Sequence, residues 1–230
     1  MKIKHKILTL ILGVSLFVGC SNEEVNNENI DDIVAIINNH EVTSDYFTKT
    51  ISLQKGAVEN FYGEEVWETE ENGIKFKDRF KNDLMDQLIT IYSIYSEAEE
   101  KKFLPTEDEL NEAVDNFNKT IESNESYKND LEKSNIDETY IMYQQNQSLA
   151  IKNFEDDFME NVEITDEEAK LYYDENKDEF EIEDGYSDFE QVRDYIKHEL
   201  KDDEYDDEIK KIKTEAQVKI NQDVLDSIIF

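Results

Sequence analysis

Few side chains in this sequence of 230 residues are suited to acid–base or nucleophilic chemistry. The cysteine and histidine side chains are Cys20, His5, His40 and His198. A nucleophilic site needs a base within reach of the nucleophile, and no histidine stands beside a second histidine or a cysteine here. A lone cysteine also excludes an intramolecular disulfide. The sequence therefore gives no candidate catalytic residue of the histidine-activated kind, and it predicts that His40 is a surface residue.

One stretch has the alternating oxygen ligands with which a calcium-binding loop begins. These residues are Asp174, Asn176 and Asp178. The loop pattern requires glycine at its sixth position and glutamate at its twelfth, where this chain has Glu179 and Gly185. The acidic run 202–208 could attract cations diffusely, but a solvated acidic face explains it as well. We therefore expect no metal site and no cofactor.

The large excess of acidic over basic residues excludes some classes of binding partner. Aspartate and glutamate number 58 against 24 lysines and arginines, which gives a net charge of −34. Such a chain repels nucleic acid and anionic lipid headgroups, and it attracts basic or unfolded cationic polypeptides. An alternative is that the acidity only keeps the protein soluble. In either case we expect no nucleic-acid partner.

The first twenty residues have the features of a targeting segment rather than of a fold. Lys2, Lys4 and Lys6 precede an uncharged run over 7–18, which is too short to span a bilayer. The run ends in Gly19-Cys20 and resembles the bacterial lipoprotein signal. This resemblance implies a signal peptide over 1–19, lipid attachment at Cys20 and a location on the outer face of the cytoplasmic membrane of a Gram-positive bacterium. An ordinary secretory signal with an incidental cysteine is the alternative.

The longest predicted element is an amphipathic helix over residues 76–103. Apolar residues recur there at spacings of three and four, without glycine or proline, until Pro105. A helix of this length is not stable alone in water, so its apolar face needs partners. We expect the rest of the fold to be built around this helix.

Shorter elements are predicted on both sides of it. A polar tether over 20–31 leads to a strand over 33–37, a turn at Asn38-Asn39, a short returning strand and a helix capped by Thr43 or Ser44. Residues 57–73 predict a helix end followed by a mobile connection. Further helices begin at capping boxes with Thr106 and Thr165. The run 217–220 resembles a strand, and two short strands need pairing, so the chain ends should form one small sheet.

Aromatic residues on these helices are the candidates for binding apolar ligands, because the stripes offer more aromatic surface than a thin helical domain readily buries. The candidates are Phe61, Tyr62, Trp67, Tyr92, Tyr95, Tyr140, Tyr143, Phe154 and Phe158. Packing against the long helix is the alternative for the group around Trp67.

Several of these runs, taken in order, resemble the SurA and PrsA foldases. The run 33–47 (IVAIINNHEVTSDYF) resembles the opening motif of that family, and residues 86–102 and 162–180 resemble later segments. The resemblance implies a mainly α fold: an elongated helical chaperone domain of the SurA N-terminal and trigger factor C-terminal type, with a small β element. In such proteins a parvulin prolyl isomerase domain follows the position of Phe180, whereas here residues 181–187 lead directly to a helix.

The resemblance implies a domain over 32–180, a short linker over 181–187 and a C-terminal part over 188–230 that completes the same domain. It also implies a membrane-anchored chaperone that holds unfolded or partly folded secreted polypeptides without isomerase chemistry. The alternative is an adaptor lipoprotein that uses the same scaffold to bind one defined partner. The sequence leaves a homodimer open.

Replacing Cys20 with alanine tests the anchor. Because the lipid is expected on this side chain alone, the variant should accumulate as uncleaved precursor or be released into the medium. Cell fractionation and the mass of the intact protein measure both outcomes. A membrane-bound mature form of normal mass would contradict the prediction.

Overall fold

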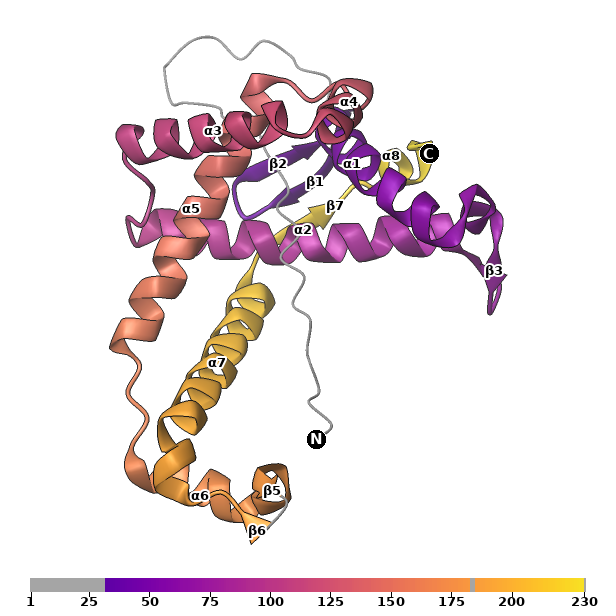
Figure 1. Ribbon diagram of the computed structural model, residues 1–230. Coiled ribbons are helices and arrows are strands. Elements are labelled where there is room, and N and C mark those ends of the chain that lie inside the picture. The colour runs from indigo at the N-terminus through magenta and orange to yellow at the C-terminus, as the bar shows by residue number, and fades with distance from the viewer. Residues whose placement is uncertain (1–31, 183–184, 230) are drawn as a thin grey trace. The chain divides into compact units, whose positions relative to one another are not determined.

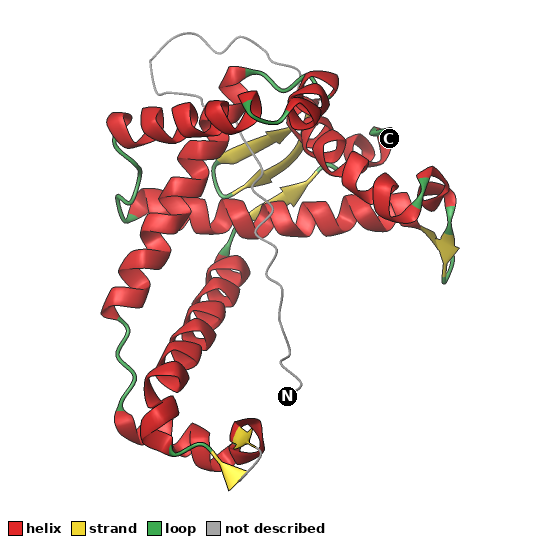
Figure 2. Ribbon diagram, in the orientation of Figure 1, coloured by secondary structure: helices red, strands yellow, loops and turns green. Residues whose placement is uncertain are grey.

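The computed structural model describes residues 32–182 and 185–229, which form a predominantly helical protein (Figures 1 and 2). The predicted mainly α class is thus confirmed. The helices are α1 (Ser44–Tyr62), α2 (Phe76–Glu100), α3 (Glu107–Glu122), α4 (Glu125–Lys133), α5 (Glu138–Asn161), α6 (Asp166–Glu175), α7 (Phe189–Glu215) and α8 (Gln222–Ser227), with 3₁₀ helices η2 (Glu64–Glu68) and η3 (Lys177–Phe180). The strands are β1 (Ile33–Ile37), β2 (His40–Thr43), β3 (Glu70–Glu71), β4 (Ile74–Lys75), β5 (Glu181–Ile182), β6 (Gly185–Tyr186) and β7 (Val218–Ile220). The signal, the tether, His5 and Cys20 lie outside the described residues.

The described residues divide into two compact units. The larger unit contains residues 32–153 together with 212–229, and the smaller unit contains residues 154–211. The sequence analysis instead placed its boundaries after residue 180 and before residue 188, on either side of the expected linker. That division into domain, linker and C-terminal part stays a prediction.

A three-stranded antiparallel sheet joins both ends of the chain in the larger unit, in the order β2-β1-β7. Asn38 takes a positive φ of 53° in the tight turn between β1 and β2, a conformation that asparagine tolerates better than most residues. Its amide N–H donates to the carbonyl of Gln217 at 2.7 Å, and the Gln217 N–H donates to Asn38 Oδ1 at 2.9 Å. The predicted pairing of the terminal strands is confirmed, with Ala35 opposite Ile220.

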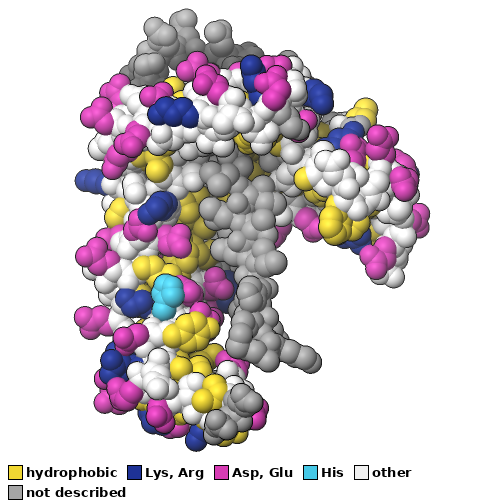
Figure 3. All heavy atoms as spheres, viewed as in Figure 1, with side chains coloured by type: hydrophobic (Ala, Val, Ile, Leu, Met, Phe, Trp, Pro, Cys, Tyr) yellow, Lys and Arg dark blue, Asp and Glu magenta, His cyan; other side chains and the backbone are white. Residues whose placement is uncertain are grey.

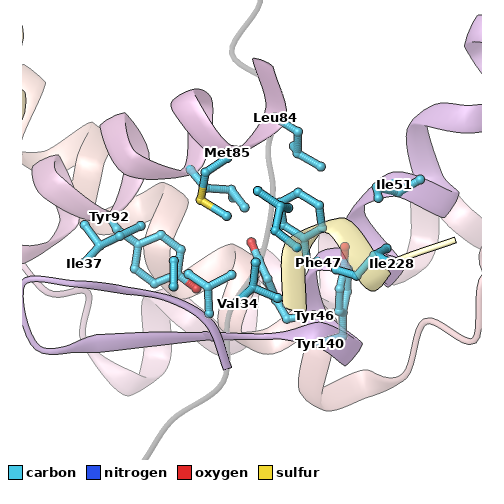
Figure 4. Packing of buried hydrophobic residues seen from close by; sticks show 14 residues of the cluster. Val34, Ile37, Tyr46, Phe47, Ile51, Leu84, Met85, Tyr92, Tyr140 and Ile228 are labelled. Carbon is cyan, nitrogen blue, oxygen red and sulfur yellow. The ribbon is translucent and has the colours of Figure 1, made fainter. Parts of the chain in front are cut away.

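The sheet packs on the middle of α2, and α1 and the C-terminal segment close the core around them (Figures 1 and 4). Val34 and Ile37 from β1, Phe47 from α1, and Leu88 and Tyr92 from α2 are all buried. Their spacing along α2 is the one that predicted the helix. Burial of several such side chains, each worth about 1.5–3 kcal/mol, supplies the stability that the isolated helix lacks.

The long helix ends three residues earlier than the sequence predicted. Lys102 adopts a left-handed φ of 69°. The N–H of Lys102 then donates to Glu99 O at 3.0 Å and that of Phe103 to Ala98 O at 2.8 Å. These two bonds form a Schellman motif, which satisfies the last carbonyls of the helix before Pro105 is reached.

The other predicted helix starts agree with the structure. Thr43 caps α1 by accepting from the N–H of Tyr46 at 3.2 Å. Thr106 and Thr165 each form a complete capping box with the glutamate three residues later. The side chain and the backbone satisfy each other at these ends, so the starts are local properties of the sequence.

Two hairpins were missed by the sequence analysis. Residues 57–73 were expected to be a helix end followed by a mobile connection. The helix end is confirmed, because α1 ends at Tyr62, but η2 and the β3–β4 hairpin follow in place of the mobile connection. Asn72 and Gly73, with φ of 54° and 81°, form the two-residue loop of that hairpin, and Asn-Gly is the usual pair for such a loop. The expected linker 181–187 contains the second hairpin, in which β5 pairs with β6.

The smaller unit has its own core. Ala169 and Tyr173 from α6, Phe180 from η3 and Ile196 from α7 are buried together. The hydroxyl of Tyr173 donates to the carbonyl of Ser187 at 2.6 Å, which fixes the end of the hairpin against α6. Residues 177–182 and 185–187 are therefore part of this unit.

The C-terminal helix α8 is fastened to the larger unit by a buried lysine. The Lys81 ammonium on α2 donates to the carbonyls of Leu225, Asp226 and Ile228 at 3.3–3.4 Å. A cation at the C-terminal end of a helix also complements the helix dipole. The side chains of Leu225 and Ile228 enter the same core as β1.

Truncating Leu225 tests this attachment, and Ile229 is the matched control. Leu225 is 2 % exposed and Ile229 is 86 % exposed. Leu225→Ala should lower the free energy of unfolding of the larger unit by about 2–5 kcal/mol, because it leaves a core cavity. Ile229→Ala should change it by less than about 0.5 kcal/mol. Urea denaturation followed by circular dichroism measures both, and equal effects would contradict the described core.

Candidate functional site

Six of the nine candidate aromatic residues are buried rather than available to a ligand. These six are Trp67, Tyr92, Tyr95, Tyr140, Tyr143 and Phe154. The expectation that the helical stripes leave a surplus of aromatic surface is therefore wrong for them. The partner helices cover the stripes: the rings of Tyr95 and Tyr143 lie 6.0 Å apart between α2 and α5, and those of Tyr46 and Tyr92 lie 6.3 Å apart between α1 and α2.

The phenols in this group are structural. Asn146 Nδ2 donates to the hydroxyl of Tyr95 at 2.9 Å. Burial raises the pKa of the phenols of Tyr95, Tyr140 and Tyr143 above the usual range. They stay neutral at physiological pH, so they contribute packing and hydrogen bonds rather than acid–base chemistry.

Phe158 is half-buried in the smaller unit. Its ring lies 5.4 Å from that of Tyr205, which Phe154 also contacts at 6.2 Å. Phe154 and Phe158 thus hold α5 against α7 within that unit, and the structure does not bring them together with the other candidates.

Phe61 and Tyr62 are the two candidates that remain well exposed, at 79 % and 59 %. They occupy the last turn of α1, with ring centroids 4.7 Å apart. The ring centroid of Tyr62 lies 6.3 Å from that of Phe76 on α2, and the ring centroid of Phe76 lies 5.4 Å from that of Trp67. We call these rings, Phe61, Tyr62, Trp67, Phe76 and Phe80, the aromatic patch.

The patch forms because the chain reverses directly after Tyr62. Gly63 has a positive φ of 85°, and its N–H donates to the carbonyl of Glu59 at 2.9 Å, which ends α1. A residue with a Cβ is disfavoured in this conformation. The reversal leaves Phe61 and Tyr62 at the surface and returns Trp67, which is 6 % exposed, to the side of α2. The indole of Trp67 donates to Glu59 Oε1 at 2.9 Å.

Ion pairs fix the hairpin and the start of α2 beside the patch. Lys75 and Lys77 donate to the two carboxylate oxygens of Glu68 at 2.6 and 2.5 Å. These hydrogen bonds lower the pKa of Glu68 to about 2. Arg79 donates to Glu71 at 2.6 Å, and its guanidinium lies 5.4 Å from the centre of the Phe76 ring. These contacts fix the hairpin against the start of α2, which carries Phe76.

A cleft and a groove hollow the surface of the larger unit among the described residues. A cleft of about 340 Å³ lies beside the aromatic patch, with Trp67, Glu64, Lys77 and Ile229 in its wall. A groove of about 560 Å³ follows β1 and β7, with Ile33, Ile36 and Ile220 in its wall. Figure 3 shows acidic side chains over much of the visible surface, and hydrophobic side chains exposed near the end that carries β3. Surfaces of this kind can bind apolar segments of another chain.

The remaining chemistry-bearing residues form structural contacts. His40, predicted to lie at the surface, is partly buried: its Nε2 lies 3.0 Å from Glu99 Oε2, and its ring lies 5.3 Å from that of Tyr95. Asp174 accepts from Lys170, and Asn176 Nδ2 donates to the carbonyl of Tyr172 at the end of α6. Over 32–182 and 185–229, no group of three acidic, histidine or cysteine residues is placed to hold a metal ion.

No helix among the described residues combines the length and the apolar character needed to cross a membrane.

The chain belongs to the family of SurA-like N-terminal domains, whose model matches residues 2–155. It is similar to the foldase protein PrsA of Caldanaerobacter subterraneus subsp. tengcongensis, with 28 % identity over 79 % of this chain and 54 % of the relative. The PrsA proteins of Clostridium perfringens strain SM101 and Clostridium botulinum strain Kyoto are each 26 % identical over 78 % of this chain, and the matches cover 54 % and 56 % of those proteins. The chain spans about half the length of these curated relatives. The comparison with solved structures finds no significant match.

The sequence analysis missed two parts of this surface. Ile74 in the β3–β4 hairpin is exposed. Ile229 near the C-terminus is also exposed, and it shares the wall of the cleft with Trp67. The Asn72-Gly73 pair could have revealed the hairpin that carries Ile74. No local signal could have placed Ile229, because its position depends on the docking of α8 far along the chain.

Truncation of Trp67 and truncation of Phe61 should differ strongly in their effect on stability. Trp67→Ala should lower the free energy of unfolding by about 3–5 kcal/mol, because it empties a buried site between η2 and α2. Phe61→Ala should lower it by less than about 0.5 kcal/mol, because the ring is exposed. Urea denaturation followed by circular dichroism avoids dependence on the Trp67 signal. A large loss for Phe61→Ala would contradict its placement at the surface.

Proposed function

We propose that the protein is a membrane-anchored extracytoplasmic chaperone that holds unfolded secreted polypeptides and has no prolyl isomerase activity. Membership of the SurA-like family and the similarity to foldases support the chaperone class. The observation that carries the proposal at the level of residues is the aromatic patch, where the exposed rings of Phe61 and Tyr62 adjoin the ring of Phe76 on α2. Such a surface offers apolar contact at little cost in side-chain entropy.

The anchoring part of the proposal rests on the N-terminal sequence. Residues 1–19 resemble a lipoprotein signal that ends before Cys20. A lipid at that position would place the tether and the folded units outside the membrane, where secreted chains emerge. The high acidity of the chain would keep a complex with an apolar client in solution.

The absence of isomerase chemistry is proposed from the connection after η3. The N–H of Ser187 donates to the carbonyl of Phe180 at 2.9 Å, and β5 and β6 pair between these two residues. This short hairpin stands where the resemblance places an isomerase domain. His40 is paired with Glu99, and His198 is exposed 4.0 Å from Asp202. A proline-binding pocket with paired histidines has no counterpart in these arrangements.

The holding activity is tested by light scattering of two unrelated, chemically denatured clients. The mature protein should slow the aggregation of both, and Phe61→Ser/Tyr62→Ser should weaken the effect several-fold without changing the melting temperature. Leu171→Ser/Tyr195→Ser is the matched control, because these apolar residues of the smaller unit are similarly exposed. A control variant that loses as much activity as the patch variant would overturn the assignment to the patch.

The same assay separates the chaperone from an adaptor. Suppression of aggregation for several clients supports the chaperone. If no client is protected at any salt concentration, and one native protein is retained instead on the immobilised chain, the adaptor is the better description.

The isomerase prediction has its own measurement. The mature protein should not accelerate the cis/trans relaxation of a proline tetrapeptide above the uncatalysed rate, which is in the range of tens of seconds or slower at 25 °C. An active parvulin measured in parallel shows that the assay can detect catalysis. Acceleration by the protein would contradict the absence of an isomerase site.

A further inference from the structure

The cations around the aromatic patch are all engaged by carboxylates. Lys55 pairs with Glu59 at 3.6 Å, Lys75 and Lys77 with Glu68, and Arg79 with Glu71. These pairs use Glu59, Glu68 and Glu71. Among the described residues, Glu64 and Glu65 form no ion pair, although both follow Tyr62 within three positions. The patch is therefore bordered by two exposed acids that are not engaged in an ion pair within the described part of the chain.

Both acids follow the exposed rings within four positions of the sequence, directly after Gly63. A Cβ placed on Gly63 would come within 2.8 Å of Glu65 Oε2, so this carboxylate lies over the backbone next to Tyr62. Glu64 shares the wall of the cleft with Trp67 and Ile229. Acceptors for a cation thus lie at the turn that follows the exposed rings and in the wall of the cleft that contains Trp67 and Ile229.

Local acids matter more here than the net charge of the whole chain. At physiological ionic strength the Debye length is about 8 Å, so distant carboxylates are largely screened from a bound segment. A lysine or arginine beside Phe61 or Tyr62 can also gain from contact with the ring face. The local arrangement consequently favours a cation placed next to an apolar residue.

We propose that the aromatic patch selects unfolded segments in which lysine or arginine flanks aliphatic or aromatic residues, with Glu64 and Glu65 receiving the cation. The proposal rests on the chaperone function proposed above and defines the class of client segment. The same positions would disfavour segments whose apolar residues are flanked by aspartate or glutamate.

The test uses three fluorescent peptides with the same apolar centre and with lysine, glutamine or glutamate on both sides. Anisotropy titrations at 0.15 M salt should give the tightest binding for the lysine peptide and the weakest for the glutamate peptide. E64Q/E65Q should reduce the lysine-over-glutamine preference by about three- to ten-fold, the range expected for two exposed ion pairs. It should leave binding of the glutamine peptide unchanged.

The matched control is E112Q/E132Q, which removes the same charge from exposed positions on α3 and α4. Its lysine preference should equal that of the wild type, and both variants should keep the wild-type melting temperature. A preference that survives in E64Q/E65Q, or that falls equally in the control, would assign the selectivity to the whole molecule and overturn the proposal. A dimer that Phe61→Ser/Tyr62→Ser dissociates in sedimentation would identify a second copy as the occupant and also overturn it.

Failure of this inference is distinguishable from failure of the chaperone function. Suppression of client aggregation by the wild type, without any difference among the three peptides, overturns the selectivity alone. Loss of both aggregation suppression and peptide binding overturns both.

Discussion

The larger unit depends on the burial of one face of α2. That helix has apolar side chains over most of its length, and the sheet, α1, α5 and α8 each cover part of them. The sheet that covers α2 takes β1 and β2 from the N-terminal part of the chain and β7 from near its C-terminus, because β1 pairs with both β2 and β7. Its contribution is to give α2 a continuous apolar surface that no single neighbouring helix could provide.

Local patterns predicted the elements whose causes are local. The spacing of Leu88 and Tyr92 predicted α2, and the threonine–glutamate pairs predicted two capping boxes, since both signals lie within one or two helical turns. The end of α2 was predicted at the wrong residue because Lys102 adopts a left-handed conformation, which a lysine in the sequence does not indicate. The β3–β4 hairpin was missed although Asn72-Gly73 is a local signal, because its strands are only two residues long and lack an apolar alternation.

The candidate site was predicted less well, for a physical reason. An aromatic residue on an amphipathic stripe has the same local pattern whether a partner helix covers it or not. Tyr95 and Tyr143 are buried because α5 lies against α2, and the sequence around each residue does not encode that neighbour. Phe61 and Tyr62 remain exposed because Gly63 turns the chain before any element can cover them. Exposure was decided by where helices stop and not by how many aromatic residues they contain.

The pairing of β1 with β7 also sets an order on how the protein can fold. Asn38 and Gln217, which hydrogen-bond to each other, stand 179 positions apart along the chain. A chain made from its N-terminus at about 5–20 residues per second has all of β1, α1 and α2 several seconds before β7 and α8 exist. During that interval the apolar face of β1 and the site of Leu225 lack their final cover. Each newly made molecule thus passes through a stage in which part of its own core is still uncovered.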